Sequence, residues 1–401
     1  MGCNWNRVLL SDCLMLVIDH RGKTPKKLGG DWAEKGYRAI SAKNIKTGRL
    51  VNLDSVKHVN SDLYRKWMPV EVARGDIFVT SEAPFGQVYF WDSDEKIVLS
   101  QRIFGLRVNT EKCHPLFLYY WMCSREFQSE LANRATGTTV IGLRQPELMK
   151  CSVRLPDFQT QEKVASFLRL LDIKINLNNR INDYLSEIGS ALFSYEILES
   201  IDDTWLRASL LDIASYKNGL AMQKYRPEKD DPGLPVLKIK ELAQGQCAAD
   251  AERCRSDIDE SVKIFDGDLI FSWSGTLLLD FWAGGNAGLN QHLFKVTSKK
   301  YKQWFYYFWT NYHMRKFITL AKDRATTMGH IKRSALAESE VYIPNENKMN
   351  ELDKLFDPLI KKIISLKIES RILSELRNEL LPKLMSGEID VCKVGVLVER
   401  L

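Results

Sequence analysis

The apolar residues of this chain follow two spacings, and each spacing occurs twice. Short apolar runs separated by Gly, Pro and Asp are typical of β-strands in loop-rich modules. They predict strands at residues 37–40, 77–80, 87–91 and 103–108, and again at 234–239, 268–273 and 292–296. An aromatic-rich stretch with helical character follows each set, at residues 115–131 and 301–320. The pattern therefore predicts two α+β modules with aromatic cores.

Two longer segments carry apolar residues in steps of three and four, the spacing of a heptad seam. The predicted seam residues are Val164, Leu168, Leu171, Ile175, Leu185 and Leu192 in the first segment and Leu352, Phe356, Leu359, Ile363, Leu366, Leu373, Leu380 and Leu384 in the second. Asn178, Asn182 and Gly189 interrupt the first seam, and Ser370 and Arg377 interrupt the second at comparable places. Asp157 and Asn345 stand where helix N-caps belong. Pro358 either kinks the second helix or marks a late start.

The same signals recur in the same order 188 to 192 residues later. Gly75-Asp76 returns as Gly267-Asp268, and Gln101 returns as Gln291. Ala135-Thr136 returns as Ala325-Thr326, and Leu155-Pro156 returns as Ile343-Pro344, each time just before a long helical segment. Solenoid repeats are much shorter, so the unit is a duplicated domain. Two similar modules in one chain suit a target with two sites.

Composition agrees with two soluble domains. A chain of 401 residues is too long for one ordinary core, and it contains no apolar run of membrane-spanning length and no signal peptide at its start. We therefore expect a cytoplasmic protein. The eight cysteines form no CxxC pair and the six histidines have no zinc-finger spacing, so we expect reduced cysteines and no metal.

Charge is unevenly distributed between the modules. Lys and Arg outnumber Asp and Glu by six in residues 1–158 but by only one in residues 197–345. A basic first module fits a polyanionic partner, whereas a phosphate-facing patch in the second module must be local. A solvated surface of mixed charge is the alternative for both.

No catalytic signature stands out. The chain lacks a GxxxxGK[ST] loop, a GxGxxG turn after a strand, an HExxH helix, a GxSxG elbow and the tetrapeptide of amino-methyltransferases. Pro156-Asp157 with Glu162-Lys163 is similar to a nuclease pattern, but the residue between Glu and Lys is missing. Helix capping explains these residues better.

The remaining chemistry is that of recognition. DNA readers use Lys and Arg for phosphates, and Arg, Lys, Asn, Gln, Ser and Thr for base edges. The candidate DNA-binding residues of the first module are Arg21, Lys23, Thr24, Lys43, Asn44, Lys46, Ser81, Gln87, Gln101, Arg102, Thr138, Thr139 and Arg144. Those of the second are Lys238, Lys240, Ser272, Ser274, Gln291, His292, Thr326, Thr327, His330, Lys332 and Arg333. Gln101 and Gln291, with the Thr-rich loops, are the strongest candidates because they recur at matching places.

A helix of about 38 residues is roughly 57 Å long, and its seam needs a partner. The simplest partner is the other long helix, packed antiparallel, so that two heads are held apart by a two-helix spacer. The alternative is that each helix folds back on its own module. A rod of this length spans about 17 base pairs of DNA.

These residues also resemble a known family. The stretch 155–165 (LPDFQTQEKVA), followed by Leu171–Ile175 and Asn178–Asn182, resembles the central conserved region of type I restriction-modification specificity subunits, and so does the closing stretch 376–389. The second copy departs from the signature, with Ile343-Pro344-Asn345-Glu346-Asn347-Lys348 where the first has the fuller Gln-Glu motif. This departure leaves the start of the second helix open.

The resemblance implies a non-catalytic DNA-specificity subunit with two pseudo-twofold-related mixed α/β target-recognition domains, joined by two long helices packed as an antiparallel coiled coil. The expected division is 1–158 and 197–345 for these domains, 159–196 and 346–385 for the helices, and 386–401 for a tail. Each domain would read one half of a bipartite site in double-stranded DNA. The implied partners are methyltransferase subunits, which carry S-adenosylmethionine, and restriction subunits, which carry ATP and Mg, while this chain binds no cofactor. Exposed docking surfaces would permit self-association of the isolated chain, so its oligomeric state stays open.

Two other classes stay open on the residues alone. One is a protein-interaction scaffold whose duplicated heads bind proteins rather than DNA, and the other is an enzyme of undetected type. A salt titration separates the first from a DNA reader, because DNA binding weakens steeply as salt rises. Turnover by the purified chain would indicate the second.

Overall fold

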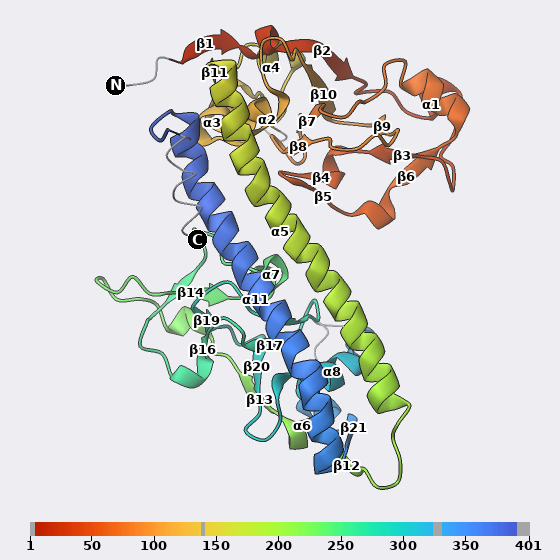
Figure 1. The fold of residues 1–401 in the computed structure, drawn as a ribbon, viewed down its shortest axis with the longest axis vertical. Helices are drawn as coiled ribbons and strands as arrows, with labels where there is room; N and C mark the ends of the chain where they lie inside the picture. Colours follow the sequence, from red (N-terminus) through yellow and green to blue (C-terminus); the bar gives the residue numbers. More distant parts are fainter. Residues whose placement is uncertain (1–4, 138–140, 324–330, 391–401) are drawn as a thin grey trace. The chain divides into compact units, whose positions relative to one another are not determined.

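The computed structural model describes residues 5–137, 141–323 and 331–390. The chain forms two compact units: unit 1 comprises Met1–Asp172 with Leu376–Leu401, and unit 2 comprises Ile173–Glu375. Two long helices, α5 (Phe158–Phe193) and α11 (Glu346–Met385), each contribute one part to unit 1 and the other part to unit 2 (Figure 1). Among the described residues, no helix combines the length and apolar character needed to cross a membrane.

Unit 1 is built around a four-stranded antiparallel sheet in the order β2–β10–β7–β8. A second sheet has the order β6–β3–β9, in which β3 and β9 are parallel, while β4 pairs with β5 and β1 pairs with β11. The strands are β1 (Asn6–Leu9), β2 (Leu14–Asp19), β3 (Tyr37–Ile40), β4 (Ile45–Lys46), β5 (Arg49–Leu50), β6 (Lys57–Val59), β7 (Ile77–Thr80), β8 (Val88–Phe90), β9 (Val98–Leu99), β10 (Ile103–Val108) and β11 (Ser152–Leu155). The helices are α1 (Ser61–Trp67), α2 (Pro115–Cys123), α3 (Arg125–Arg134) and α4 (Gln145–Met149).

The central strands of unit 1, β7 and β10, are buried at almost every position because both faces of the sheet are covered. Side chains alternate between faces along a strand, and accordingly Ile77 and Val79 enter one core while Phe78 enters another. The first core lies under α2 and α3 and includes Phe117 and Phe127. The second lies between the two sheets and includes Trp67.

Unit 2 repeats this plan. Its main sheet has the order β13–β20–β17–β18, its second sheet has the order β15–β14–β19–β16 with β14 and β19 parallel, and β12 pairs with β21. The strands are β12 (Leu206–Ser209), β13 (Ser215–Asn218), β14 (Leu234–Leu237), β15 (Arg253–Cys254), β16 (Lys263–Ile264), β17 (Leu269–Ser272), β18 (Leu279–Phe281), β19 (Ala287–Leu289), β20 (Leu293–Thr297) and β21 (Glu340–Ile343). The helices are α6 (Leu210–Ile213), α7 (Ile239–Gln244), α8 (Gln303–Tyr312), α9 (Met314–Asp323) and α10 (Arg333–Ala337). As in unit 1, Leu269 and Phe271 enter one core and Ile270 enters the other.

The start of each long helix is fixed by a side-chain cap. The Asp157 carboxylate accepts a hydrogen bond from the Thr160 N–H at 3.0 Å, and the Asn345 side chain accepts one from the Lys348 N–H at 3.0 Å. Both predicted N-caps are therefore confirmed. Helix α11 begins directly after Asn345, so Pro358 does not mark a late start. Each predicted aromatic helix is in fact two, since α2 gives way to α3 at Ser124 and α8 to α9 at His313.

Within unit 1, the first turns of α5 pack beside the last turns of α11. Val164 and Leu168 share the first core with Leu380 and Leu384. Gln161 is buried and joins helix to domain, because its Oε1 accepts from the His114 N–H at 2.9 Å and its Nε2 donates to the Pro156 carbonyl at 2.9 Å. Gln161 thus anchors the start of α5 to the domain.

Within unit 2, the rest of α5 packs against the first part of α11. Asn178 Nδ2 donates to Glu369 at 2.9 Å, and the Lys348 ammonium pairs at 2.8 Å with Glu196, which lies just beyond the end of α5. Gly189 allows close approach, because a Cβ at that position would lie 2.7 Å from the Phe308 ring and 3.3 Å from Leu359. Since later residues of α5 meet earlier residues of α11, the helices are antiparallel.

The predicted seam is enclosed along its whole length. Buried positions are Val164, Leu168, Leu171, Leu352, Phe356, Ile363, Leu366, Leu380 and Leu384, and half-buried positions are Ile175, Leu185, Leu192, Leu359 and Leu373. The interrupting Asn178, Asn182 and Ser370 are also buried. The predicted fold class is confirmed, and the alternative in which each helix serves only its own module is not observed, because each unit contains parts of both helices.

Candidate nucleic-acid interface

A recess of about 460 Å³ in unit 1 gathers several of the predicted recognition residues. It is lined by Arg21, Gly22, Ser81, Glu82, Gln101, Arg102, Thr136, Gly142, Leu143 and Arg144. Five of these were predicted as DNA-binding residues and come from four separate segments of the sequence: Arg21, Ser81, Gln101 with Arg102, and Arg144. The fold brings them together because β2, β7 and β10 are neighbours in one sheet and the 142–144 segment runs beside the end of β7.

The backbone of this recess is held by strand-like hydrogen bonds beyond the sheet. The Ser81 N–H donates to the Arg102 carbonyl at 2.8 Å, and the Leu143 N–H donates to the Ser81 carbonyl at 3.0 Å. Arg102 adopts φ 67° and Ala83 adopts φ 44°, a region that non-glycine residues rarely occupy. Such strain concentrates at functional sites, and the Arg102 side chain beside Gln101 is 47% exposed.

The three arginines that line this recess differ in their ion pairing. Arg21 donates to both carboxylate oxygens of Asp19 at 2.8 Å, and its guanidinium lies 4.0 Å from the centre of the Phe104 ring. Arg102 Nε pairs with Glu82 at 2.9 Å. Arg144 is exposed and has no ion pair among the described residues. Arg144 and Arg102 are thus the two arginines best placed to reach a partner.

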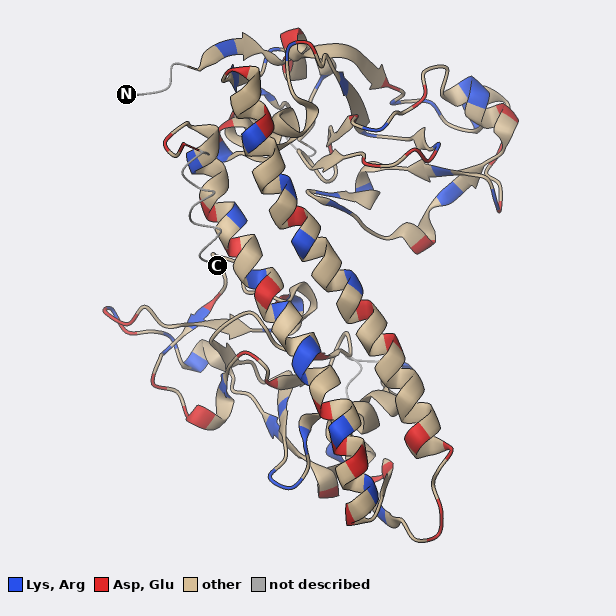
Figure 2. Cartoon of the chain, viewed as in Figure 1, with Lys and Arg blue, Asp and Glu red and all other residues tan. Residues whose placement is uncertain are grey.

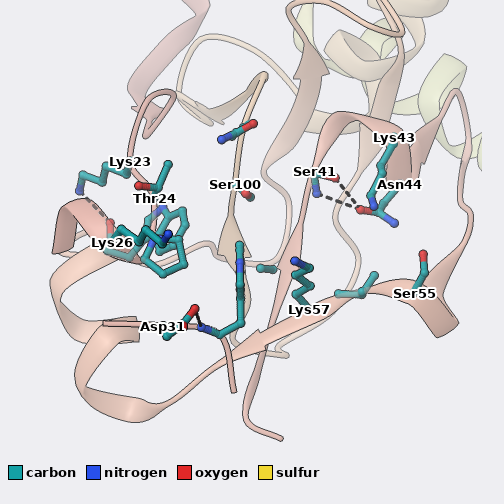
Figure 3. A pocket seen from close by; sticks show the side chains of 16 residues that line it. Lys23, Thr24, Lys26, Asp31, Ser41, Lys43, Asn44, Ser55, Lys57 and Ser100 are labelled. Atoms are coloured by element: carbon teal, nitrogen blue, oxygen red, sulfur yellow. Dashed lines mark hydrogen bonds between the residues drawn. The ribbon is translucent and has the colours of Figure 1, made fainter. Parts of the chain in front are cut away.

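A second recess of about 460 Å³ lies on the other side of Gln101, which lines both. Its residues are Lys23, Thr24, Pro25, Lys26, Asp31, Trp32, Ala39, Ser41, Lys43, Asn44, Ser55, Val56, Lys57, Trp67, Ser100 and Gln101. Figure 3 shows Lys23, Thr24 and Lys26 on one side of it and Ser41, Lys43 and Asn44 on the other. Lys23 is half-buried and donates to the Trp67 carbonyl at 2.8 Å, and burial lowers the pKa of its ammonium group.

Some predicted contact residues in unit 1 have their side chains committed within the protein. Asn44 is buried, accepts from Ser41 N and Oγ at 3.1 and 2.8 Å, and donates to the Val51 and Asn52 carbonyls at 3.3 Å. Gln87 Oε1 accepts from Thr47 N and Oγ1 at 3.0 and 3.2 Å. These side chains shape turns and are not free for a DNA partner in this conformation. Lys46 is exposed, and Thr138 and Thr139 lie outside the described residues.

Unit 2 places a different polar pair at the same position. Ser274 Oγ lies 3.0 Å from His292 Nδ1, and Gln291 Nε2 lies 3.3 Å from His292 Nε2. The backbone bonds match those of unit 1, since Trp273 N–H donates to the His292 carbonyl at 3.4 Å and Ile331 N–H donates to the Trp273 carbonyl at 2.9 Å. Glu82–Arg102 in unit 1 and Ser274–His292 in unit 2 are therefore equivalent pairs, each next to a glutamine.

The other predicted residues of unit 2 are divided between surface and interior. Lys240, Lys332 and Arg333 are exposed, and Lys332 precedes α10 as Arg144 precedes α4. Ser272 is fully buried and donates to the Ser274 and Thr276 carbonyls at 3.1 and 2.8 Å, while Lys238 pairs with Glu252. Thr326, Thr327 and His330 lie outside the described residues.

The structure also brings in residues that the sequence did not indicate. Glu82 lines the first recess, together with Thr136 from the predicted Thr-rich loop, and Lys26, Trp32 and Lys57 line the second. Glu82 stands one residue from Ser81 and at the position matching Ser274, so the duplication could have revealed it. Trp32 had no such signal, because an isolated tryptophan in a loop-rich stretch is equally compatible with a core position.

The fold and this site define a class: a duplicated recognition protein in which two related α+β units present matched polar pairs and share two antiparallel helices. Comparison with known proteins identifies the family. The family model described as type I restriction modification DNA specificity domain matches residues 4–187 and 202–377, one match for each copy. The chain therefore belongs to the type I restriction-modification DNA specificity family, as its sequence motifs predict.

Individual relatives agree with this assignment. The chain is 23% identical over 349 residues to the type I restriction enzyme MjaIX specificity subunit of Methanocaldococcus jannaschii, covering 79% of this chain and 78% of the relative. It is 24% identical over 200 residues to the EcoBI specificity subunit of Escherichia coli, covering 48% of this chain and 41% of the relative. The crystal structure of the type I restriction-modification S subunit from M. genitalium has the same fold, with a TM-score of 0.56, 16% identity, and coverage of 95% and 96% of the two chains. Because these relatives are specificity subunits, the chain is assigned to the specificity role and not to a catalytic one.

Proposed function

We propose that this chain is the DNA sequence-specificity subunit of a type I restriction-modification complex and that each unit reads one half of a bipartite site in double-stranded DNA. The observation that carries the proposal is the equivalence of Glu82–Arg102 and Ser274–His292. The backbone around the pair is the same in both units, and the side chains differ. A common scaffold with different polar groups suits two half-sites of different sequence.

The chemistry of each pair indicates how it would read bases. Arginine donates two hydrogen bonds to guanine O6 and N7, glutamine pairs with adenine N6 and N7, and a carboxylate accepts from the cytosine amino group. Arg102, Gln101 and Glu82 supply all three in unit 1. In unit 2, Gln291, His292 and Ser274 supply hydrogen-bond donors and acceptors. Exposed lysines around each site, such as Lys46 and Lys332, would contact phosphates and set the register.

The long helices would fix the distance between the half-sites. Both helices are continuous, and each is embedded in both units through its seam. Insertion of one heptad into each helix at matched positions should lengthen the unread gap and leave both half-sites unchanged. A methylation map that showed the original gap would contradict this role.

The outer face of α5 offers a docking surface for partner subunits. Within unit 2, the α5 residues Ile173, Leu177, Tyr184 and Ile188 recur at helical spacing and are 47%, 48%, 54% and 52% exposed, and Tyr195 in the helical segment that follows α5 is 66% exposed. An apolar stripe of this kind marks a protein interface. Acidic and basic residues are interspersed elsewhere along α5 and α11 (Figure 2). The stripe suits an amphipathic helix of a methyltransferase subunit, and it would also permit self-association of the isolated chain.

In the assembled complex the chemistry would reside in the partners. Methyltransferase subunits would carry S-adenosylmethionine, restriction subunits would carry ATP and Mg, and this chain would bind no cofactor. Such a complex acts on DNA in the cytoplasm. A scaffold that binds only proteins would lack the steep loss of DNA affinity with rising salt that phosphate contacts impose.

Exchange of residues 1–158 for the equivalent segment of a relative tests the proposal. Methylated sites mapped across the genome of a host with the chimaera should change in one half only. A change in both halves, or in neither, would refute the assignment of one half-site to each unit. Loss of all methylation is interpreted only if the chimaera still co-purifies with the methyltransferase subunits.

A further inference from the structure

The recess beside Gln101 that contains Trp32 is a built site of its own. Trp67 and Ala39 form buried walls, whereas Trp32 is 36% exposed at its opening. The two indole rings are tilted, with centres 6.1 Å apart. The volume of the recess, about 460 Å³, lies in the range of pockets that hold small organic ligands.

The charge of this recess is strongly one-sided. Among the described residues that line it, four are lysines and Asp31 alone is acidic. In the described part of the chain, Lys26, Lys43 and Lys57 have no ion pair. Elsewhere in unit 1, basic side chains such as Arg21, Arg38, Lys96 and Arg107 each pair with a carboxylate. The Asp31 carboxylate accepts from the Trp32 N–H at 2.8 Å and so is partly engaged. Unpaired cations around a concave surface attract an anion.

Beside the lysines, the recess also offers an aromatic surface, the Trp32 ring. The Lys57 ammonium lies 5.2 Å from the centre of the Trp32 ring, so a cation and an aromatic surface adjoin at the same opening. Ser41, Ser100 and Gln101 add hydrogen-bonding groups to the lining of the recess, and Figure 3 shows the first two. A ligand that uses all of these has a planar ring, polar ring edges and a negative charge, which is the chemistry of a nucleotide.

We propose that this recess binds a single nucleotide, with its base against Trp32 and its phosphate among Lys26, Lys43 and Lys57. The inference rests on the proposed function, because the nearest source of such a nucleotide is the DNA that unit 1 reads. Gln101 lines both recesses, so a base that leaves the duplex beside the Arg102 recess would meet this site next. A free mononucleotide has the same chemistry and is the other source.

Two arms of one experiment, both on the full-length chain, separate the sources. In the first, duplexes containing the methylated site carry 2-aminopurine at successive positions of the half-site that unit 1 reads. An unstacked base fluoresces more strongly, so one position should brighten on binding. In the second arm, the four deoxynucleoside monophosphates and inorganic phosphate are titrated separately, with tryptophan fluorescence as the readout.

Substitutions of recess residues test whether the fluorescence changes arise from binding in this recess. Trp32→Leu should weaken nucleotide binding roughly 5- to 100-fold, and Trp32→Phe, which keeps a ring, should restore part of it. Lys57→Gln and Lys43→Gln should each weaken binding and reduce the salt dependence by about one phosphate contact. Lys35→Gln is the matched control, because Lys35 is exposed in the same unit and does not line the recess. Thermal unfolding checks that each variant is folded.

Each outcome decides something. Brightening at one position that Trp32→Leu abolishes supports a nucleotide from bound DNA. Monophosphate binding without brightening supports a free nucleotide, and a response to inorganic phosphate alone overturns the base contact. No response in either arm, with duplex binding intact by anisotropy, overturns the proposal and leaves the half-site assignment standing, since the domain exchange tests that separately.

Discussion

Asp172 of α5 accepts a hydrogen bond from Arg377 of α11, with 2.6 Å between Oδ1 and Nη1, and its second oxygen accepts one from the Tyr120 hydroxyl at 2.7 Å. The Asp172 side chain is only 13% exposed. One carboxylate therefore joins both long helices to the aromatic helix α2 within unit 1. Burial beside this carboxylate raises the pKa of the Tyr120 hydroxyl, which keeps it protonated as a donor.

Removal of one partner of this ion pair should cost more than removal of both. Arg377→Met leaves a mostly buried carboxylate with a single donor, and we expect a loss of about 2–4 kcal/mol in the free energy of unfolding. The double variant Asp172→Leu/Arg377→Met should be closer to the original protein. Urea unfolding measures both. The exposed pair Lys383–Glu379 is the control, and Lys383→Met should cost far less than Arg377→Met because solvent screens an exposed ion pair.

Arg102 and His292 should control different half-sites. Arg102→Ala is expected to cost about 1–3 kcal/mol of discrimination at one base pair of the first half-site and to leave the second unchanged. His292→Ala should do the converse. Binding to a library of duplexes, followed by sequencing, reads both halves at once.

The matched control for these variants is Arg65→Ala, because Arg65 is exposed on α1 and, within the described ranges, forms its ion pair with Asp62. If Arg102→Ala and Arg65→Ala lowered affinity equally and without change in sequence preference, Arg102 would be a phosphate contact. A shift in both half-sites from one variant would contradict the independence of the two units.

His313 should make the stability of unit 2 sensitive to acid. Burial lowers the pKa of its imidazole to about 4, and its Nε2 lies 2.8 Å from the Glu340 carbonyl. The unfolded chain takes up a proton near pH 6.5, and the folded chain only near pH 4. Stability is therefore complete above about pH 6.5 and falls as the pH drops towards 4, by up to roughly 3 kcal/mol.

Thermal unfolding between pH 8 and pH 4 measures this slope. His313→Gln, which keeps a donor for the Glu340 carbonyl and cannot titrate, should show a shallower decline than the original chain over the same window. His20 and His114 also have pKa values lowered by burial and contribute in both proteins. Identical slopes would show that His313 does not carry the effect.

The apolar stripe on α5 should govern assembly. Tyr184→Glu with Ile188→Glu places two charges on a surface proposed to become buried, and we expect more than a tenfold loss of affinity for the methyltransferase subunits. Self-association of the isolated chain should fall as well. Analytical ultracentrifugation and co-purification measure the two effects. Lys362→Glu, an exposed substitution on α11 outside the stripe, should leave assembly unchanged.

Much of the fold could be predicted from the sequence, because the patterns that specify these elements lie within short segments. The caps Asp157 and Asn345, the heptad spacing and the apolar runs of β7 and β10 each act within a few residues. The closing pairs β1–β11 and β12–β21 were not predicted, since they join residues about 140 apart through four-residue strands with little pattern.

The candidate site could be predicted from the sequence only in part, because the direction of a side chain depends on distant residues. Gln101 and Gln291 stood out through duplication, and the structure places both next to polar pairs. Asn44, Gln87 and Ser272 were chosen for their residue type, but their side chains hydrogen-bond to nearby backbone and side-chain groups. Residue type gives the chemistry of a side chain, whereas its direction depends on long-range packing. The assignment of individual DNA contacts stays a prediction.

Leu380, Leu384 and Met385 belong to the same core as Phe104 and Phe117. A ribosome that has made only the first half of the chain has therefore produced a unit whose interior is incomplete. That half must wait, with apolar side chains uncovered, until the last helix emerges. Nascent chains of this protein should depend on chaperones during synthesis, and premature truncation should be cleared by proteases rather than yield a working half.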